Sequence, residues 1–206
     1  MKKNGEQMSG NLSERKILDA TLNAVAKHSI SRTRMHLIAE EANTATSNLH
    51  YYFKTKEDLL MALLTDLQET FDTKRNNYIA KSEDTLESRI SSFFDQKKDL
   101  ILNDPQYDKV QFDFWVLSQS DEDIHEMFLP SYTDWHDHIR SIIQEYCPDI
   151  EPAQLDMVPY IMISMMMGAS MQYLNNTKAF KLDDYFDMCR SIILDLLHKL
   201  ENKDGE

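Results

Sequence analysis

The chain has 206 residues, of which 42% are hydrophobic and 28% are charged, an ordinary balance for a globular protein. Only four glycines and five prolines occur, which favours an all-helical fold, and we expect about nine helices. The two cysteines, Cys147 and Cys189, lie far apart, which argues against a zinc site or a secreted disulfide framework. No apolar stretch resembles a signal peptide or is long enough to span a bilayer, so we expect a cytoplasmic protein without a membrane segment.

The net charge of −13 argues against DNA binding until it is divided by position. Residues 1–56 contain nine basic and five acidic side chains, a net charge of +4, whereas residues 57–206 contain thirteen and thirty, a net charge of −17. A basic segment can approach phosphate while an acidic remainder discourages nonspecific adhesion. The charge pattern therefore predicts a basic N-terminal head on an acidic body.

The N-terminal segment divides into two parts by pattern. Residues 1–12 carry no apolar periodicity, so we expect a flexible arm. Ser13 is expected to cap a helix whose apolar side chains between Ile17 and Val25 form one face. This helix should brace the elements that follow it.

Two short helices joined by a turn are predicted between Thr33 and Lys56. Apolar residues fall on one face of each helix, Ile38, Ala39 and Ala42 on the first and Leu49, Tyr52 and Phe53 on the second. Helices of about two turns are not stable alone, so the pair must pack on a larger scaffold.

The polar side of the second helix has the chemistry of a DNA-reading surface. Thr33 is a good N-cap for the first helix, and either Thr44 or Thr46 suits the second. The first turn of the second helix then exposes short hydrogen-bonding side chains, namely Thr46, Ser47, Asn48 and His50. A helix with such an N-terminal turn, held by a preceding helix, has the geometry of a recognition helix in the major groove.

These residues resemble the DNA-binding domain of the TetR family of bacterial repressors. The similarity runs from Ile17 to about Leu64 and rests on three motifs: I-A-x-x-A from Ile38, L-x-Y-Y-F from Leu49, and K-T-K-E-D-L-L from Lys54. The chain departs from the family at Asn43, where a glycine is usual, at His50, where a tyrosine is frequent, and at Arg34 and Met35, where small hydroxyl residues are usual. Asparagine tolerates left-handed backbone, so the fold expectation stands while the operator sequence stays open.

The resemblance assigns residues 13–56 to DNA binding and residues 57–206 to effector binding and dimerisation. It implies that Lys56 and Tyr52 contact phosphate, that Arg34 adds a further phosphate contact and that His36 contacts a base or the backbone. Thr46, Ser47, Asn48 and His50 are the candidates for groove contacts.

A long helix is predicted after the head. Thr55 and Asp58 form a pair like a capping box, and the apolar residues Leu60, Leu63, Leu64, Leu67 and Phe71 follow at helical spacing. Because this helix runs from head to body, it is the natural lever by which a change in the body could move the head.

The body is predicted to contain the effector pocket. From Ser82, an apolar helical stripe carries Lys97 near its centre, where the ammonium either reaches water or an acid such as Asp113, or serves as the counter-charge of an anionic ligand. The helix from about Tyr107 to Ser118 is apolar on all sides and could wall a cavity. The candidate pocket residues are Phe93, Lys97, Phe112, Trp115, Trp135 and Met165.

This region is also similar, more weakly, to the BetI-like subgroup of the family, through Phe114-Trp115 and the later Tyr132-x-x-Trp135. The similarity implies a pocket and not a particular effector. Aromatic residues there could hold a quaternary ammonium by cation–π attraction, although an ordinary aromatic core is the simpler interpretation.

The last two helices are predicted to form a homodimer interface. Pro130 should kink or restart an earlier helix, Pro152 should start the penultimate helix, and Pro159 should bend it. The final helix carries an apolar stripe, from Phe186 to Leu200, that is too wide for one neighbour. Paired with its twofold copy it would form a four-helix interface, although both helices could merely close the monomer core.

Two other functional classes remain as alternatives. Glu122 and His125 have the Glu-x-x-His spacing of a helical di-iron site, and Asp134, His136 and His138 follow, but a second such motif is absent. A helical interaction module would not explain the basic head. We therefore expect no catalysis, no metal and no cofactor, and instead a ligand-responsive DNA-binding regulator. A repressor released from a pseudo-palindromic operator by a small molecule is the favoured form, and the choice between repressor and activator stays open. The effector and its charge, and the regulated genes, stay open.

Overall fold

The computed structural model describes residues 2–202, with side chains from Ser13 onward, and every regular element in that range is a helix. This confirms the all-helical fold: nine helices are accompanied by α8, a single turn of four residues, Pro152–Leu155. The described chain forms two compact units. The head unit comprises the residues up to Thr70 with Gln106–Leu129, and the body unit comprises Phe71–Pro105 with the residues from Pro130 onward.

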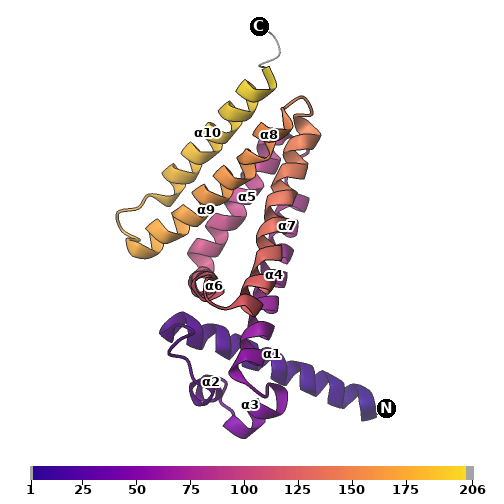
Figure 1. The fold of residues 1–206 in the computed structure, drawn as a ribbon, viewed down its shortest axis with the longest axis vertical. Coiled ribbons are helices and arrows are strands. Elements are labelled where there is room, and N and C mark those ends of the chain that lie inside the picture. Colours follow the sequence, from indigo (N-terminus) through magenta and orange to yellow (C-terminus); the bar gives the residue numbers. More distant parts are fainter. Residues whose placement is uncertain (1, 203–206) are drawn as a thin grey trace. The chain divides into compact units, whose positions relative to one another are not determined.

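The head unit is built around three N-terminal helices, α1 (Lys2–His28), α2 (Met35–Glu41) and α3 (Thr46–Tyr52). Helix α1 packs on α2, and α2 packs on α3 (Figure 1). The unit also contains the first part of α4 (Lys56–Lys81), nearly all of α6 (Pro105–Ser118) and the first turns of α7 (Glu122–Tyr146).

Helix α1 begins earlier than the sequence suggested. It extends from Lys2, so Ser13 lies inside the helix and does not cap it. Residues 2–12 contain no proline, and their backbone continues the helix without a break. The N-terminal segment that we expected to be a separate arm is therefore helical over residues 2–12.

The capping prediction at the start of α4 is confirmed. The backbone N–H of Thr55 donates to Asp58 Oδ2 at 3.0 Å, and the N–H of Asp58 donates to Thr55 Oγ1 at 3.0 Å. This reciprocal pair satisfies two donors that a helix start otherwise leaves without partners.

The structure bears on the expectations for two prolines. Helix α7 continues through Pro130, so the helix does not restart there, and the kink stays a prediction. The division between the two units falls at this residue. The expected penultimate helix is divided into α8 and α9 (Met157–Asn175), so Pro159 lies in the first turn of α9. A missing N–H has no consequence there, because first-turn donors have no helical acceptor.

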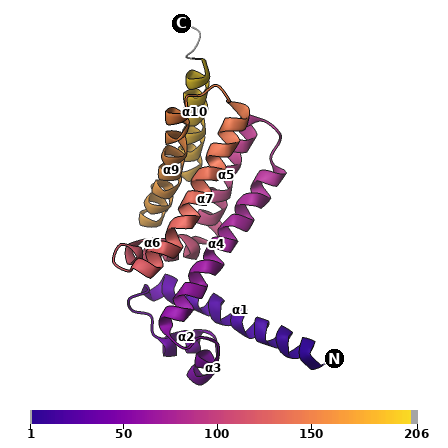
Figure 2. The same ribbon diagram turned by 45° about the vertical axis from the view of Figure 1, so that its right-hand side comes forward.

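The body unit packs α5 (Leu86–Asn103), α9 and α10 (Leu182–Glu201) against one another (Figure 2). Its core is apolar and aromatic, with the rings of Phe94 and Phe186 centred 5.7 Å apart. Ion pairs at the edge of this core join α5 to α10: Arg190 pairs with Asp95 at 2.6 Å, and Lys98 pairs with Asp183.

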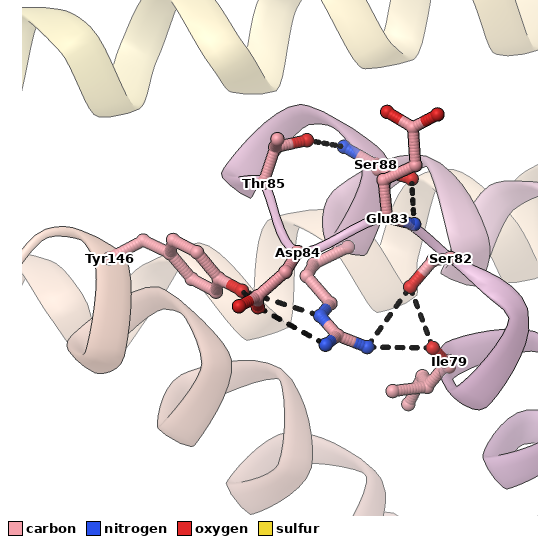
Figure 3. Close-up of polar contacts among 8 residues, drawn as sticks. Ile79, Ser82, Glu83, Asp84, Thr85, Ser88 and Tyr146 are labelled. Carbon is pink, nitrogen blue, oxygen red and sulfur yellow. Dashed lines mark hydrogen bonds and ion pairs between the residues drawn. The ribbon is translucent and has the colours of Figure 1, made fainter.

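A polar cluster around Arg89 of α5 joins three further segments of the body unit, and Figure 3 labels its partners Ile79, Ser82, Asp84 and Tyr146. The guanidinium donates to the carbonyl of Ile79 at 2.7 Å and to Ser82 Oγ at 3.1 Å, which satisfies acceptors at the end of α4. Arg89 also donates to Tyr146 of α7 at 3.4 Å, and the Tyr146 hydroxyl donates to Asp84. That hydrogen bond, followed by those from Arg89, lowers the pKa of Asp84 below its usual range.

No helix within residues 2–202 combines the length and the apolar character that crossing a membrane would require.

Candidate nucleic-acid interface

An apolar cluster packs against the buried faces of the two short helices α2 and α3. Ile38 of α2 and Leu49 of α3 are fully buried, and they pack in one cluster with other buried side chains of the head, namely Ile17, Ala24, Phe53 and Leu59. The predicted inward positions Ala39 and Ala42 are buried as well. The scaffold that helices of this length require is therefore provided by α1 and the start of α4.

The turn between the helices has the backbone conformation that its sequence suggested. Asn43 has a φ of 48°, in the left-handed region where the family uses glycine. The next residue, Thr44, donates its backbone N–H to the carbonyl of Ala39 at 2.9 Å, which closes the end of α2.

The caps of both helices differ from the prediction. The N-cap of α2 is Arg34. The hydroxyl of Thr33, the expected cap, is buried and donates to the carbonyl of Ser29 at 2.7 Å. The N-cap of α3 is Ala45, and neither cap residue makes a side-chain capping bond. The free backbone donors at the start of α3 are thus left for solvent or for another acceptor.

The predicted groove contacts lie on one accessible turn of α3. Ser47, Asn48 and His50 are exposed, and Thr46 is half-buried. The Asn48 amide donates to Thr44 Oγ1 at 2.9 Å, and His50 Nδ1 lies 3.1 Å from the carbonyl of Lys54. These local hydrogen bonds orient the side chains and leave their other polar atoms available to base edges.

Tyr51 is a surface residue that the sequence reasoning missed. It is 73% exposed, whereas the predicted phosphate contact Tyr52 is half-buried and packs against the core of the head. The two rings form an edge-to-face pair with centroids 5.1 Å apart. The helical period could have revealed the difference, because Tyr51 lies about 200° around the helix from buried Leu49.

The predicted phosphate contacts Lys56 and Arg34 lie at the start of α4 and the start of α2. The Lys56 ammonium donates to the carbonyl of Ile30 at 2.5 Å, and Arg34 donates to the carbonyl of Ser31 at 3.2 Å. Partial burial, and then the positive charge of Arg34, lower the pKa of Lys56. Mutual repulsion between two cations is typical of a surface arranged for an anionic partner. His36, the remaining predicted contact, is exposed on α2.

The predicted effector residues are divided between the two units. In the body unit, Phe93 and Trp135 belong to the buried core and Met165 packs against it. In the head unit, Phe112 is half-buried and Trp115 is 50% exposed. The indole N–H of Trp135 is buried and finds no acceptor among the described residues.

Lys97 is 2% exposed, so its ammonium does not reach water as one interpretation required. It lies 3.9 Å from Met167 Sδ. Asp113, suggested above as a partner for Lys97, accepts a hydrogen bond from the backbone N–H of Ile30.

The residues that suggested a di-iron site are placed differently from such a centre. Within the part of the chain that the structure describes, no three His, Cys, Asp or Glu side chains are grouped to hold a metal ion. Glu122 and His125 are exposed, and His136 Nε2 lies 3.0 Å from the carbonyl of Asp156.

Two protein-family models match the chain. Residues 17–63 match the bacterial regulatory proteins of the tetR family, and residues 87–198 match the C-terminal domain of BetI-type transcriptional repressors. The second match alone covers more than half of the chain.

Solved structures share the fold at low sequence identity. A transcriptional regulator from Saccharomonospora viridis in complex with choline is 18% identical, with a TM-score of 0.77 over 91% of this chain and 96% of that one. FadR from Bacillus subtilis in complex with stearoyl-CoA is 16% identical, with a TM-score of 0.75 over 87% and 96%. Identities this low show the fold alone.

One curated relative, the fatty acid metabolism regulator protein of Bacillus subtilis, is 26% identical over 76 residues. The matched segment spans 37% of this chain and 36% of that relative.

Proposed function

Because the chain belongs to the tetR family of bacterial regulatory proteins and has a BetI-type C-terminal domain, we propose that it is a cytoplasmic repressor released from DNA by a small molecule. The family consists of transcriptional regulators and not of enzymes. Residues 13–56 are the proposed DNA-binding domain, and residues 57–206 are the proposed effector-binding and dimerisation domain. The observation that carries the proposal is the exposed polar turn of α3, together with the mutual repulsion of the cations Arg34 and Lys56 in the same unit.

Base reading is proposed for the exposed turn of α3, and phosphate contact for the cations and tyrosines around it. Asn48 presents an amide, which can make two hydrogen bonds to the major-groove edge of an adenine. Thr46, Ser47 and His50 offer further hydrogen bonds, and His36 approaches from α2. Tyr51 joins Tyr52 as a proposed phosphate contact because its ring is the more exposed of the two.

A homodimer through α9 and α10 is proposed for reading a pseudo-palindromic operator. One face of α10 is used within the monomer, since Phe186, Ile193 and Leu197 are buried. Large apolar side chains remain exposed on the two helices: Met157, Tyr160, Ile161, Met171, Met188 and Ile192. An exposed apolar surface of this kind supports a protein interface, and a twofold reader needs one.

The proposed effector is an oxygen-bearing anion with an apolar portion. Trp135 offers a buried N–H without an acceptor among the described residues, and Phe93 lies in the same core. Lys97, one helical turn from Phe93, supplies a buried positive charge. Donors and a cation favour a carboxylate, phosphate or acyl oxygen over the quaternary ammonium of choline. The relative that binds stearoyl-CoA provides one probe of this class, and the relative that binds choline provides the opposite one.

Effector binding is proposed to shift the population between two arrangements of the protein. Helix α4 contributes residues to both units, so a change around residues 71–81 can reach Lys56 at its other end. Helix α4, which starts at the capping pair of Thr55 and Asp58, is the proposed connection between effector binding and the DNA-binding residues.

The decisive experiment selects an operator from random DNA and measures affinity by fluorescence anisotropy with and without stearoyl-CoA or choline. We expect stearoyl-CoA, and not choline, to lower operator affinity. Tight binding of stearoyl-CoA that leaves operator affinity unchanged would contradict the coupling. Because the chain has two tryptophans, the Trp115→Phe variant leaves Trp135 as the only tryptophan, whose fluorescence then reports binding in the body.

A further inference from the structure

We infer that Asp113 of α6 is a positioning residue for DNA binding, which acts through Ile30 on the phosphate-contacting cation Lys56. Asp113 Oδ2 accepts a hydrogen bond from the backbone N–H of Ile30 at 2.7 Å, across 83 positions in the sequence. The carbonyl of the same residue accepts from the Lys56 ammonium at 2.5 Å. All three residues belong to the head unit. The inference rests on the proposed phosphate contact of Lys56.

The Ile30 N–H needs this acceptor because of its place in the chain. Helix α1 ends at His28, and Ser29 adopts a φ of 67°, so the backbone leaves the helical path just before Ile30. Ile30 is 6% exposed. A buried N–H without a partner is destabilising, so loss of the Asp113 carboxylate would drive the loop to expose this group to water.

The loop that Asp113 holds contains two arginines, and its Ile30 carbonyl accepts a hydrogen bond from Lys56. It runs from Ser29 to Arg34 and contains Arg32 and Arg34, and Arg34 donates to the carbonyl of Ser31 at 3.2 Å. The Lys56 ammonium has three donors, of which the Ile30 carbonyl takes one. The carbonyl therefore aims the ammonium while its other donors stay available to a phosphate.

Packing alone does not hold the loop on its Lys56 side. An open hollow of about 420 Å³ lies there, lined by Ile30 and Ser31 together with Lys56, Leu60, Met61 and Leu117. The hydrogen bond that the Ile30 N–H donates to Asp113 and the one that Lys56 donates to the Ile30 carbonyl therefore have a larger share in fixing the loop than they would have in a closely packed region.

A positioning role and a purely electrostatic role of Asp113 predict opposite effects of its removal on DNA affinity. If Asp113 acted only as a negative charge near a DNA-binding surface, its removal would strengthen DNA binding. A positioning role requires that Asp113→Ala weakens binding. Asp113→Asn, whose amide oxygen can still accept from Ile30, should retain most of it.

The test measures the affinity of the full chain for a short random-sequence duplex over a series of salt concentrations. We expect Asp113→Ala to reduce affinity about three- to tenfold and to flatten the salt slope by about one phosphate contact per protomer, with Asp113→Asn close to wild type. Glu122→Ala, which removes an exposed carboxylate from the same unit, serves as the charge control and should not weaken binding.

A double-mutant cycle with Lys56→Ala separates this inference from the proposed DNA surface. If Asp113 acts through Lys56, the double variant loses no more affinity than Lys56→Ala alone. Additive losses, equal losses in Asp113→Asn and Asp113→Ala, or stronger binding by Asp113→Ala would overturn the inference. No loss in Lys56→Ala itself would instead refute the phosphate contact on which it rests.

Hydrogen exchange of the Ile30 amide keeps the inference testable if Asp113→Ala does not fold. The structure requires a protected amide in the wild-type protein and in Asp113→Asn. Rapid exchange at Ile30 in the folded wild-type protein would overturn the inference without any variant.

Discussion

The exposed turn of α3 and the body unit use polar side chains in different ways. The candidate base-reading side chains of α3 bond to neighbours four positions away, as Asn48 does to Thr44 and His50 to Lys54. In the body, polar side chains join helices that are distant in sequence, as Arg190 does with Asp95. The side chains of the α3 turn are therefore held by local bonds, whereas those of the body hold its own helices together.

This difference predicts which substitutions alter function and which alter stability. An exposed side chain with a local hydrogen bond can be replaced without leaving a buried group unsatisfied. A buried aromatic side chain cannot be replaced without leaving a cavity. The experiments below test whether the two units separate in this way.

The largest effect is expected from Phe186→Ala in the body. Phe186 is fully buried beside Phe94, so its truncation should lower the free energy of unfolding by about 3–5 kcal/mol, measured by urea denaturation. Ser191→Ala, on the exposed face of α10, provides the control and should change it by less than about 0.5 kcal/mol. Similar losses from both variants would contradict the placement of the core.

The next largest effect is expected on the alkylation rate of the Cys147 thiol. Both cysteines lie in the body unit and none lies in the head unit, so this rate reports on the body alone. Burial raises the pKa of Cys147 to about 11. The thiolate is the reactive form, so alkylation by iodoacetamide at mildly alkaline pH should be about a hundredfold slower in the folded protein than in urea. Leu49→Ala, which weakens only the core of the head, should leave this rate unchanged if the units open separately.

The same raised pKa predicts the direction of a pH effect on stability. Between about 9 and about 11 the folded protein retains a proton that the unfolded chain has released. The free energy of unfolding should therefore fall as the pH rises through this interval. Cys147→Ser should reduce this dependence in urea titrations.

Part of the short-range architecture of the head could be predicted from its sequence, although the caps expected at Ser13, Thr33 and Thr44 or Thr46 were wrong. The spacing of Ile38, Ala39, Ala42 and Leu49 identified buried positions, Asn43 identified the left-handed turn, and Thr55 with Asp58 identified the start of α4. Each of these signals lies within a few residues, which is the range over which helical period and capping operate.

The remaining features depend on contacts that no local pattern encodes. Asp113 and Ile30 are 83 residues apart, and neither has a neighbour in sequence that indicates the hydrogen bond between them. The grouping of most of α6 with the head is a result of the same long-range packing. For Lys97, the helical period gave its position in the stripe but not the near-complete burial of its ammonium.

A smaller effect, confined to function, is expected from Asn48→Ala. Because Asn48 is exposed and bonds only locally to Thr44, stability should change by less than about 0.5 kcal/mol. Affinity should fall by about 1–3 kcal/mol at sites that carry the base it reads and little elsewhere, which a panel of operator variants can measure. An equal loss at every site would argue against base reading.

The smallest expected effect comes from the titration of Lys56. Burial and the charge of Arg34 lower its pKa, so its ammonium loses its proton at a lower pH than an ordinary lysine. DNA affinity should therefore decline on the alkaline side as the charge on Lys56 is lost, by a few-fold for a single phosphate contact. Lys56→Arg keeps a permanent charge and should lessen the decline, in anisotropy titrations at constant ionic strength. The same decline in both proteins would assign it to another group, and the Lys56 ammonium would then be a support for Ile30 more than a contact to phosphate.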